Sequence, residues 1–250
     1  MTALNRHTPP CSAASYVGKQ EDAGACVPTK SKAMKQESDP IEMSRNETAY
    51  ALLKDKLTTL AYPPGEFLNI ATLVESLQIG RTPINHALHR LATEGLVQVI
   101  PRKGVVVSPL SINDALHLID VRLANERLCA RLAAERITAA EVEDLRKVAG
   151  AFDAAVQTRD MPLIMNCDRL FHERIAAASG NSILIEILKV LHARSQRFWA
   201  ISLAAEGHLA EVTTEHQDIV AALAANDVDA AVRTVEAHIL SFRQSLLRGR

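Results

Sequence analysis

Apolar residues recur at helical spacing along most of the chain, and a different pattern interrupts them only between residues 96 and 107. Ahead of this stretch we expect three helices, over 46–60, 69–77 and 82–94. Thr82 is read as the N-cap of the third, with Pro83 as its first residue. Two short apolar runs then flank Pro101-Arg102-Lys103-Gly104, which predicts a β-hairpin. Three helices followed by a hairpin are typical of a winged helix-turn-helix, which we place over 43–108.

Beyond Ser108 and Pro109 the helical period continues without a strand candidate. We expect six helices, over 111–135, 139–159, 160–180, 181–205, 209–225 and 227–247. Ser111, Thr138 and Asp160 have the side chains of N-caps. The predicted fold class is therefore mainly α, with an N-terminal winged helix-turn-helix and a C-terminal all-α helical bundle over 109–250. Residues 1–42 are rich in polar residues and lack periodicity, so we expect a disordered N-terminal tail.

Composition excludes several classes of protein. The formal net charge is −1, so the whole chain is not a nonspecific electrostatic binder of nucleic acid, and any such contact must come from a local patch. No apolar run approaches the roughly 20 residues that span a bilayer, and the N-terminus lacks the apolar core of a secretory signal. The four cysteines form no CxxC pair. We expect a cytoplasmic protein with reduced thiols and no membrane partner.

The helix expected over 160–180 places a carboxylate among apolar side chains. Asp168 and His172 are one helical turn apart and therefore share a face. That face also carries apolar residues at positions 164, 165, 171 and 175. A buried carboxylate costs free energy unless a cation or several donors meet it. The pattern therefore indicates that other residues of the bundle provide a partner for Asp168.

Two histidines on later helices also face inward. His216 shares its face with apolar residues at 219, 220 and 223, and His238 with those at 231, 235 and 242. One carboxylate and three imidazoles suit a divalent transition-metal ion. Our hypothesis is a metal site made of Asp168, His172, His216 and His238. The alternative is that each histidine is a hydrogen-bonded core residue. His117 is expected to be exposed and His192 lies on a mixed face, so neither belongs to the set.

The third helix of the winged domain would be the recognition helix, with its N-terminal residues aimed at the major groove. Its expected exposed residues are Arg81, Thr82, Asn85, His86, His89 and Arg90. Arginine and asparagine contact guanine and adenine edges, and a threonine hydroxyl at a helix N-terminus suits a phosphate. Phosphate or minor-groove contacts are expected at the wing tip, from Arg102, Lys103 and Gly104. The alternative is a solvated polar surface without a partner.

The residues over 63–107 resemble the DNA-binding domain of GntR-family transcriptional regulators. The resemblance rests on short motifs shared with the family: Arg81-Thr82-Pro83, Ala87-Leu88, Leu91, Glu94-Gly95-Leu96-Val97, Pro101 and Gly104. This chain has Gly80 where the family has a serine, Asn85 where it has a second arginine, and His86 where it has a glutamate. These departures concern the operator sequence rather than the DNA-binding role.

The helical part is similar to the FCD ligand-binding domain of one GntR branch. The resemblance rests on Asp168-x-x-x-His172 followed by Ala178-Ser179-Gly180-Asn181, on His216 and His238, and on Arg122-x-x-x-Glu126. It implies a divalent metal at the four ligand positions, with zinc first and nickel or manganese as alternatives. It also implies a small carboxylate effector near the metal, which Arg122 and Asn181 would bind. An Arg122–Glu126 salt bridge and a helix cap at Asn181 are the alternatives.

The function expected from the sequence is a homodimeric transcriptional regulator. It would bind double-stranded operator DNA, and a small carboxylate at the metal would change its operator affinity. One alternative is a DNA-binding regulator whose metal is purely structural. Another is a metal-dependent enzyme, but His172-Glu173 does not extend to HExxH because position 176 is alanine. We therefore expect no catalytic residues.

Overall fold

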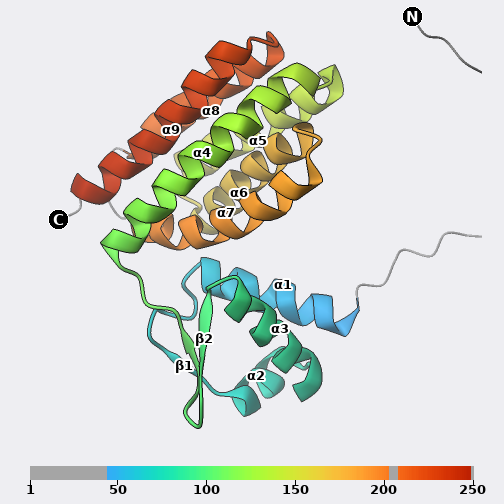
Figure 1. The fold of residues 1–250 in the computed structure, drawn as a ribbon, viewed down its shortest axis with the longest axis vertical. Coiled ribbons are helices and arrows are strands. Elements are labelled where there is room, and N and C mark those ends of the chain that lie inside the picture. Colours follow the sequence, from blue (N-terminus) through green and yellow to red (C-terminus); the bar gives the residue numbers. More distant parts are fainter. Residues whose placement is uncertain (1–43, 203–207, 249–250) are drawn as a thin grey trace, which may run out of the picture. The chain divides into compact units, whose positions relative to one another are not determined.

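A computed structural model describes residues 44–202 and 208–248. The tail expected over 1–42 and the end of the helix expected to reach 205 lie outside the described residues. Two units of secondary structure follow one another in this part of the chain, a small helical domain with a β-sheet and then a bundle of longer helices (Figure 1). The predicted fold class is confirmed. No helix within the described ranges combines the length and apolarity needed to cross a membrane.

The first unit has the predicted helices and hairpin and one additional short strand. Its elements are α1 (Arg45–Thr58), β1 (Phe67–Leu68), α2 (Ile70–Leu77), α3 (Arg81–Thr93), β2 (Val97–Ile100) and β3 (Gly104–Val107). The antiparallel sheet has the order β1-β3-β2, with Leu68 opposite Val105 and Val97 opposite Val107. The two residues of β1 are too few to show an alternating pattern, which is why the sequence did not predict this strand.

The start of α3 differs from the prediction. Gly80 is the N-cap and Arg81 the first helical residue, because the Ile84 N–H already donates to the Gly80 carbonyl. Thr82 therefore lies inside the first turn, and its side chain is not the cap. Pro83 fits there because the N–H groups of a first helical turn have no partner within the helix, so a missing one costs little.

The second unit consists of α4 (Ile112–Arg136), α5 (Ala139–Thr158), α6 (Met161–Ala178), α7 (Ser182–Ser202), α8 (His208–Ala224) and α9 (Val228–Arg248). The predicted caps form. Ser111 accepts from the Asp114 N–H, Asp160 accepts from the Leu163 N–H, and Thr138 forms a reciprocal capping box with Glu141. Because each cap satisfies N–H groups that the helix cannot, the helix starts are fixed locally by sequence.

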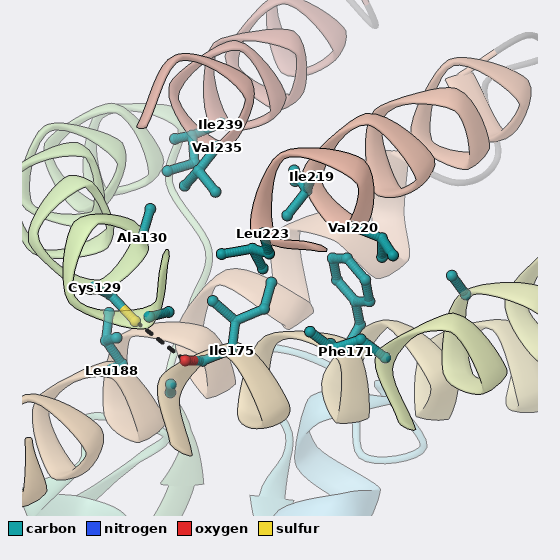
Figure 2. Close-up of a cluster of buried hydrophobic side chains, with 14 of the residues drawn as sticks. Cys129, Ala130, Phe171, Ile175, Leu188, Ile219, Val220, Leu223, Val235 and Ile239 are labelled. Atoms are coloured by element: carbon teal, nitrogen blue, oxygen red, sulfur yellow. Dashed lines mark hydrogen bonds between the residues drawn. The ribbon is translucent and has the colours of Figure 1, made fainter. Parts of the chain in front are cut away.

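The core of the bundle is apolar and contains side chains from all six helices. Figure 2 shows Phe171 and Ile175 of α6 pointing toward Ile219, Val220 and Leu223 of α8. Phe171 is completely buried, and Ile175 nearly so. The face of α6 predicted to be buried is therefore inside, and it carries Asp168 and His172 toward α8 and α9.

Candidate metal centre and DNA-contacting surface

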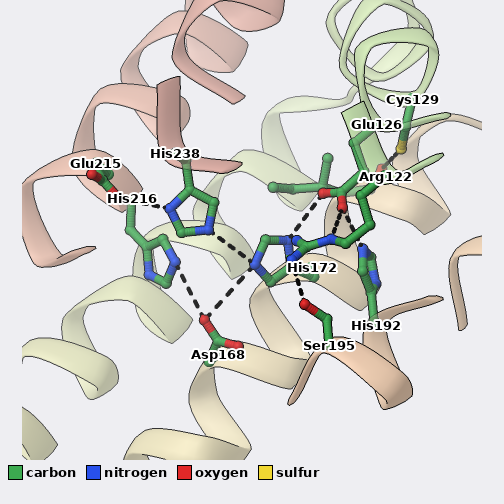
Figure 3. A network of polar contacts seen from close by, with 11 residues as sticks. Arg122, Glu126, Cys129, Asp168, His172, His192, Ser195, Glu215, His216 and His238 are labelled. Atoms are coloured by element: carbon green, nitrogen blue, oxygen red, sulfur yellow. Dashed lines mark hydrogen bonds and ion pairs between the residues drawn. The ribbon is translucent and has the colours of Figure 1, made fainter. Parts of the chain in front are cut away.

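Four polar side chains from three helices converge within the bundle. α6 contributes Asp168 and His172, α8 contributes His216, and α9 contributes His238 (Figure 3). The three histidines are buried, and one ligand atom from each lies within 4.8 Å of the others. The structure thus brings together the four residues that the sequence pattern selected, although they lie up to 70 positions apart along the chain.

The distances within this group fit a single ion. His238 Nε2 lies 3.3 Å from His172 Nε2. Asp168 Oδ1 lies 3.7 Å from His216 Nε2 and 3.8 Å from His172 Nε2. Two ligand atoms about 2.1 Å from one zinc ion are about 3.4 Å apart at tetrahedral angles. The side chains therefore need only small adjustments to hold a divalent metal.

His216 is the member of the group with the clearest need for a partner. Its side chain is 0% exposed, and among the described residues neither ring nitrogen has a hydrogen-bond partner. The ring is held by aromatic packing, stacked on Phe171 with centroids 4.0 Å apart and tilted against Phe152 at 4.8 Å. Leaving a buried polar atom without a partner costs free energy. A metal ion at Nε2 would remove this cost, so the donor set and its surroundings fit a metal.

Electrostatics favour the forms of these groups that bind metals. Burial lowers the pKa of His172 well below its ordinary value, and His192 adds to the effect. Burial, with a contribution from His238, does the same to His216. Neutral imidazoles have the free lone pair that a metal ligand requires. Burial also raises the pKa of Asp168 to about 6, so this carboxylate would be stabilised by a cation beside it.

Two further carboxylates lie behind the histidines. His238 Nδ1 is 2.8 Å from Glu215 Oε2, and His172 Nδ1 is 3.6 Å from Glu126 Oε2. In both rings Nε2 faces the centre of the group while Nδ1 faces a carboxylate. This arrangement fixes the tautomer and the orientation of a metal-binding imidazole. Burial disfavours the ionised form of Glu126, but Arg122 and His192 outweigh it and hold the Glu126 pKa well below its usual range.

A cavity of about 340 Å³ adjoins the group and is lined by Asp168, His172, His238 and Arg122 among others. Its size suits a small metabolite. Arg122 is buried; its Nε donates to Glu126 Oε1 at 2.6 Å and its Nη1 to Ser195 Oγ at 2.6 Å. The intrahelical salt bridge considered from the sequence is therefore present. Arg122 also lines the cavity, so the salt bridge with Glu126 does not exclude a contact between Arg122 and an effector.

Sequence reasoning missed His192, which belongs to the polar network. Its Nε2 lies 3.2 Å from Glu126 Oε1, and it packs against the His172 ring with centroids 4.9 Å apart. Its face is mixed in the sequence, with Leu188 on one side and the polar Ser195 and Gln196 on the other, yet both polar residues are buried. They are buried because Ser195 meets Arg122 and the Gln196 amide donates to the Met165 carbonyl. The available signal in the sequence was Arg122, because a guanidinium beside an apolar helix face needs polar partners from a neighbouring helix.

Asn181 acts as a helix cap. Its Oδ1 accepts from the Leu184 N–H at 3.1 Å, and its own carbonyl accepts from the Ile185 N–H. It is not among the residues that line the cavity. The geometry therefore gives no support to the effector contact considered for Asn181.

The side chains selected for DNA contact lie on two surfaces of the first unit. On α3, Arg81, Thr82 and His86 are exposed and Asn85 is half-buried, while the opposite face packs Ile84 and Leu88 into the core. Arg102 and Lys103, in the turn between β2 and β3, are exposed, as are Pro101 before them and Gly104, the first residue of β3. Gly104 has a φ of 108°, a backbone conformation open to glycine and strained for other residues. Both surfaces are thus accessible to a nucleic acid.

Arg90 differs from the other polar residues of α3. Its Nη1 donates to both carboxylate oxygens of Glu47, at 3.0 and 3.1 Å, and its guanidinium lies 3.6 Å from the centre of the Tyr50 ring. The side chain therefore ties α3 to α1. Expected from the sequence as a free polar position, it contributes to the packing of the domain instead.

Models of two protein families match the chain. The model described as "Bacterial regulatory proteins, gntR family" matches residues 45–107, and the model described as "FCD domain" matches residues 117–241. The first match covers the unit with the sheet, and the second covers most of the bundle, including all four residues of the candidate metal centre.

Proteins of similar sequence are described as transcriptional regulators. The chain is 32% identical over 139 residues to an uncharacterised HTH-type transcriptional regulator from the TAR-I ttuE-ttuC′ intergenic region of Agrobacterium vitis, covering 54% of this chain and 81% of that protein. It is 23% identical over 201 residues to the HTH-type transcriptional repressor RspR of Escherichia coli, covering 80% and 88%.

Among solved structures, E. coli McbR/YncC has the same fold, with a TM-score of 0.77 and 24% identity over 83% of this chain and 99% of that one. The matched domains are those of transcriptional regulators rather than enzymes. The chain is therefore a DNA-binding transcriptional regulator that belongs to the GntR family, in the branch with an FCD domain.

Proposed function

We propose that this regulator binds its operator as a homodimer and that a small carboxylate, bound at a divalent metal in the helical domain, changes its operator affinity. The observation that carries the proposal is the group of three buried imidazoles whose Nε2 atoms converge near Asp168. Within the described part of the chain, the nitrogens of His216 have no hydrogen-bond partner. The metal would be held by Asp168, His172, His216 and His238. Zinc suits this ligand set, and nickel or manganese are the alternatives.

The cavity supplies the reason to expect an effector. A purely structural zinc site is closed by its four protein ligands, but here three of the proposed ligands also line a cavity of about 340 Å³. A carboxylate in that cavity would meet the metal and the Arg122 guanidinium, whose planar shape matches carboxylate geometry. The metal, when bound, would supply an electrophilic site for one carboxylate oxygen. Arg122 would orient the acid.

The DNA contacts follow from the exposed surfaces of the first unit. Arg81, Asn85 and His86 would reach base edges from α3, and Thr82 would contact a phosphate. Arg102 and Lys103 would contact the backbone or the minor groove from the wing, where Gly104 allows the tight turn. A dimer would present two recognition helices to two half-sites of a symmetric operator.

The proposal is tested by operator affinity with and without organic acids. A duplex selected from a random pool by the metal-loaded protein would serve as operator, and fluorescence anisotropy would measure binding at fixed salt. We expect at least one small carboxylate to change the Kd, whereas acetate at the same ionic strength controls for salt. If the protein carries metal but its operator affinity is indifferent to every acid, the metal is structural and the effector proposal is wrong.

The geometry does not support a metal-dependent enzyme function. Glu173, the acidic residue next to His172, lines the cavity, but its carboxylate is held by Arg169 in a salt bridge at 2.8 Å. A general base would have to reach the reacting group by hydrogen bond, directly or through one water. The carboxylates behind the histidines, Glu126 and Glu215, are already occupied by Arg122 and His238.

A further inference from the structure

The cavity beside the candidate metal centre has cationic residues that the proposed function does not use. In addition to the residues named above, Lys54 of α1 and Lys189 of α7 line it. Asp55 of α1 lines it as well, and so do Arg169 and Glu173 of α6, which form a salt bridge with each other. With Arg122 and Asp168, the lining has four cationic and three anionic side chains, a net charge of +1 when the histidines are neutral. Both lysines lie outside the set of site residues suggested by the sequence. Lys54 lies on α1, which packs on α3, so a ligand bound at Lys54 lies close to the helix proposed to contact DNA.

Lys54 is held in place but retains capacity to bind an anion. Its Nζ is 2.9 Å from Tyr50 Oη and 2.9 Å from Glu94 Oε2, and the side chain is 17% exposed. An ammonium group has three N–H donors, and these two contacts use two of them. Burial lowers the Lys54 pKa, Glu94 opposes the shift, and the charge of nearby Lys189 lowers it further. Two cations that repel each other at a cavity wall are stabilised when an anion lies between them.

We propose that the effector carries two anionic groups, one bound at the metal and Arg122 and the other by Lys54 and Lys189. This inference rests on the proposed function, because the first group needs the metal centre. It names the chemical class of the ligand: a dicarboxylate, or a carboxylate with another terminal anion. A monocarboxylate bound at the metal and Arg122 would make no contact with Lys54 and Lys189.

The same contact would link the cavity to the recognition helix. Glu94 is the C-cap of α3, and its Oε1 accepts the Tyr50 hydroxyl at 2.7 Å while Oε2 binds Lys54. An anion at the remaining N–H donor of Lys54 shares the positive charge that Glu94 otherwise has to itself. Because Glu94 is buried, weakening this ion pair changes the energy of the contact between α1 and α3. The second anionic group of the effector thus has a direct route to the DNA-binding helix.

The test compares acids of equal carbon number that differ in one terminal carboxylate. Isothermal titration calorimetry on the zinc-loaded full-length protein would measure the Kd of succinate, glutarate and adipate against butyrate, valerate and hexanoate. We expect at least one dicarboxylate to bind about tenfold tighter than its partner, as one additional charge-assisted contact allows. Lys189→Met and Lys54→Met should each reduce that ratio toward one, because each removes a contact that only the dicarboxylate makes.

Lys189 is exposed, so its replacement leaves the fold intact even if loss of Lys54 disturbs Glu94. Lys147→Met on α5 is the matched control, since Lys147 is exposed and does not line the cavity. Equal affinity for both acids of every pair, or a preference unaffected by Lys189→Met, overturns the inference and leaves the proposed function standing. If none of the six acids binds the zinc-loaded protein, the proposed function falls together with the inference.

Discussion

At the scale of single residues, His216 shows how a buried polar side chain points to a ligand. Two phenylalanine rings fix its position, and no described residue satisfies its nitrogens. The ring is neutral because burial lowers its pKa. In the metal account the missing partner is an ion that His172, His238 and Asp168 share.

Replacing two of the proposed ligands tests that account. His216→Ala with His238→Ala removes two of four donors, so we expect the purified protein to lose stoichiometric metal by elemental analysis. His117→Ala provides the control, because His117 is an exposed histidine of α4. If the double variant retains metal at the wild-type ratio, His216 and His238 are not the ligands of that metal.

The carboxylate behind His238 should matter although it does not touch the ion. Glu215→Gln keeps the size of the side chain but loses the charge that orients His238 Nδ1. We expect zinc affinity, measured by competition with a chelating dye, to fall about ten- to hundredfold. Glu211→Gln on the same helix is the control, since Glu211 faces Arg248. Equal losses in both variants would mean that Glu215 has no specific positioning role.

At the scale of elements, α3 has one face in the core and another available to DNA. Ile84, Leu88 and Leu91 anchor it, while its first turn presents Arg81 and Thr82. Its end is held by Glu94 and Arg90, which both contact α1. Division of the helix into a free N-terminal turn and a fixed C-terminal turn suits a recognition helix that must be held at a defined angle.

Removing the first side chain of α3 should affect DNA binding alone. Arg81→Ala is expected to cost about 1–3 kcal/mol of operator binding, the range for one arginine contact to a base. The thermal transition should stay unchanged, because Arg81 is exposed. Arg146→Ala on α5 controls for the loss of a surface charge. Undiminished operator affinity in Arg81→Ala would contradict the assignment of α3 as the recognition helix.

Local sequence predicted most elements because their ends depend on local hydrogen bonds. Ser111, Thr138 and Asp160 mark helix starts through their own side chains, and apolar spacing identified the inward face of α6. Prediction was poorer where the determinant is distant along the chain. β1 is defined by its pairing with β3, His192 lies beside Glu126 of α4, and Arg90 contacts Glu47 and Tyr50 of α1.

At the scale of the whole molecule, the unit that matches the gntR family and the unit that matches the FCD domain are in direct contact. The Arg197 guanidinium donates to the Ser108 carbonyl, and Ala193 of α7 packs with the core of the first unit. A change in the helical domain can therefore reach the DNA-binding domain through packed side chains. Reciprocity then requires that an acid which changes operator affinity binds differently when DNA is present.

The central claim is that the metal centre is the place where an acid controls DNA binding. The direct test measures operator affinity by anisotropy, with and without the tightest-binding acid, for wild type and for the His216→Ala, His238→Ala double variant. We expect a shift of the operator Kd in zinc-loaded wild type and none in the variant, while both proteins bind the operator without acid. An equal shift in both proteins would contradict the central claim.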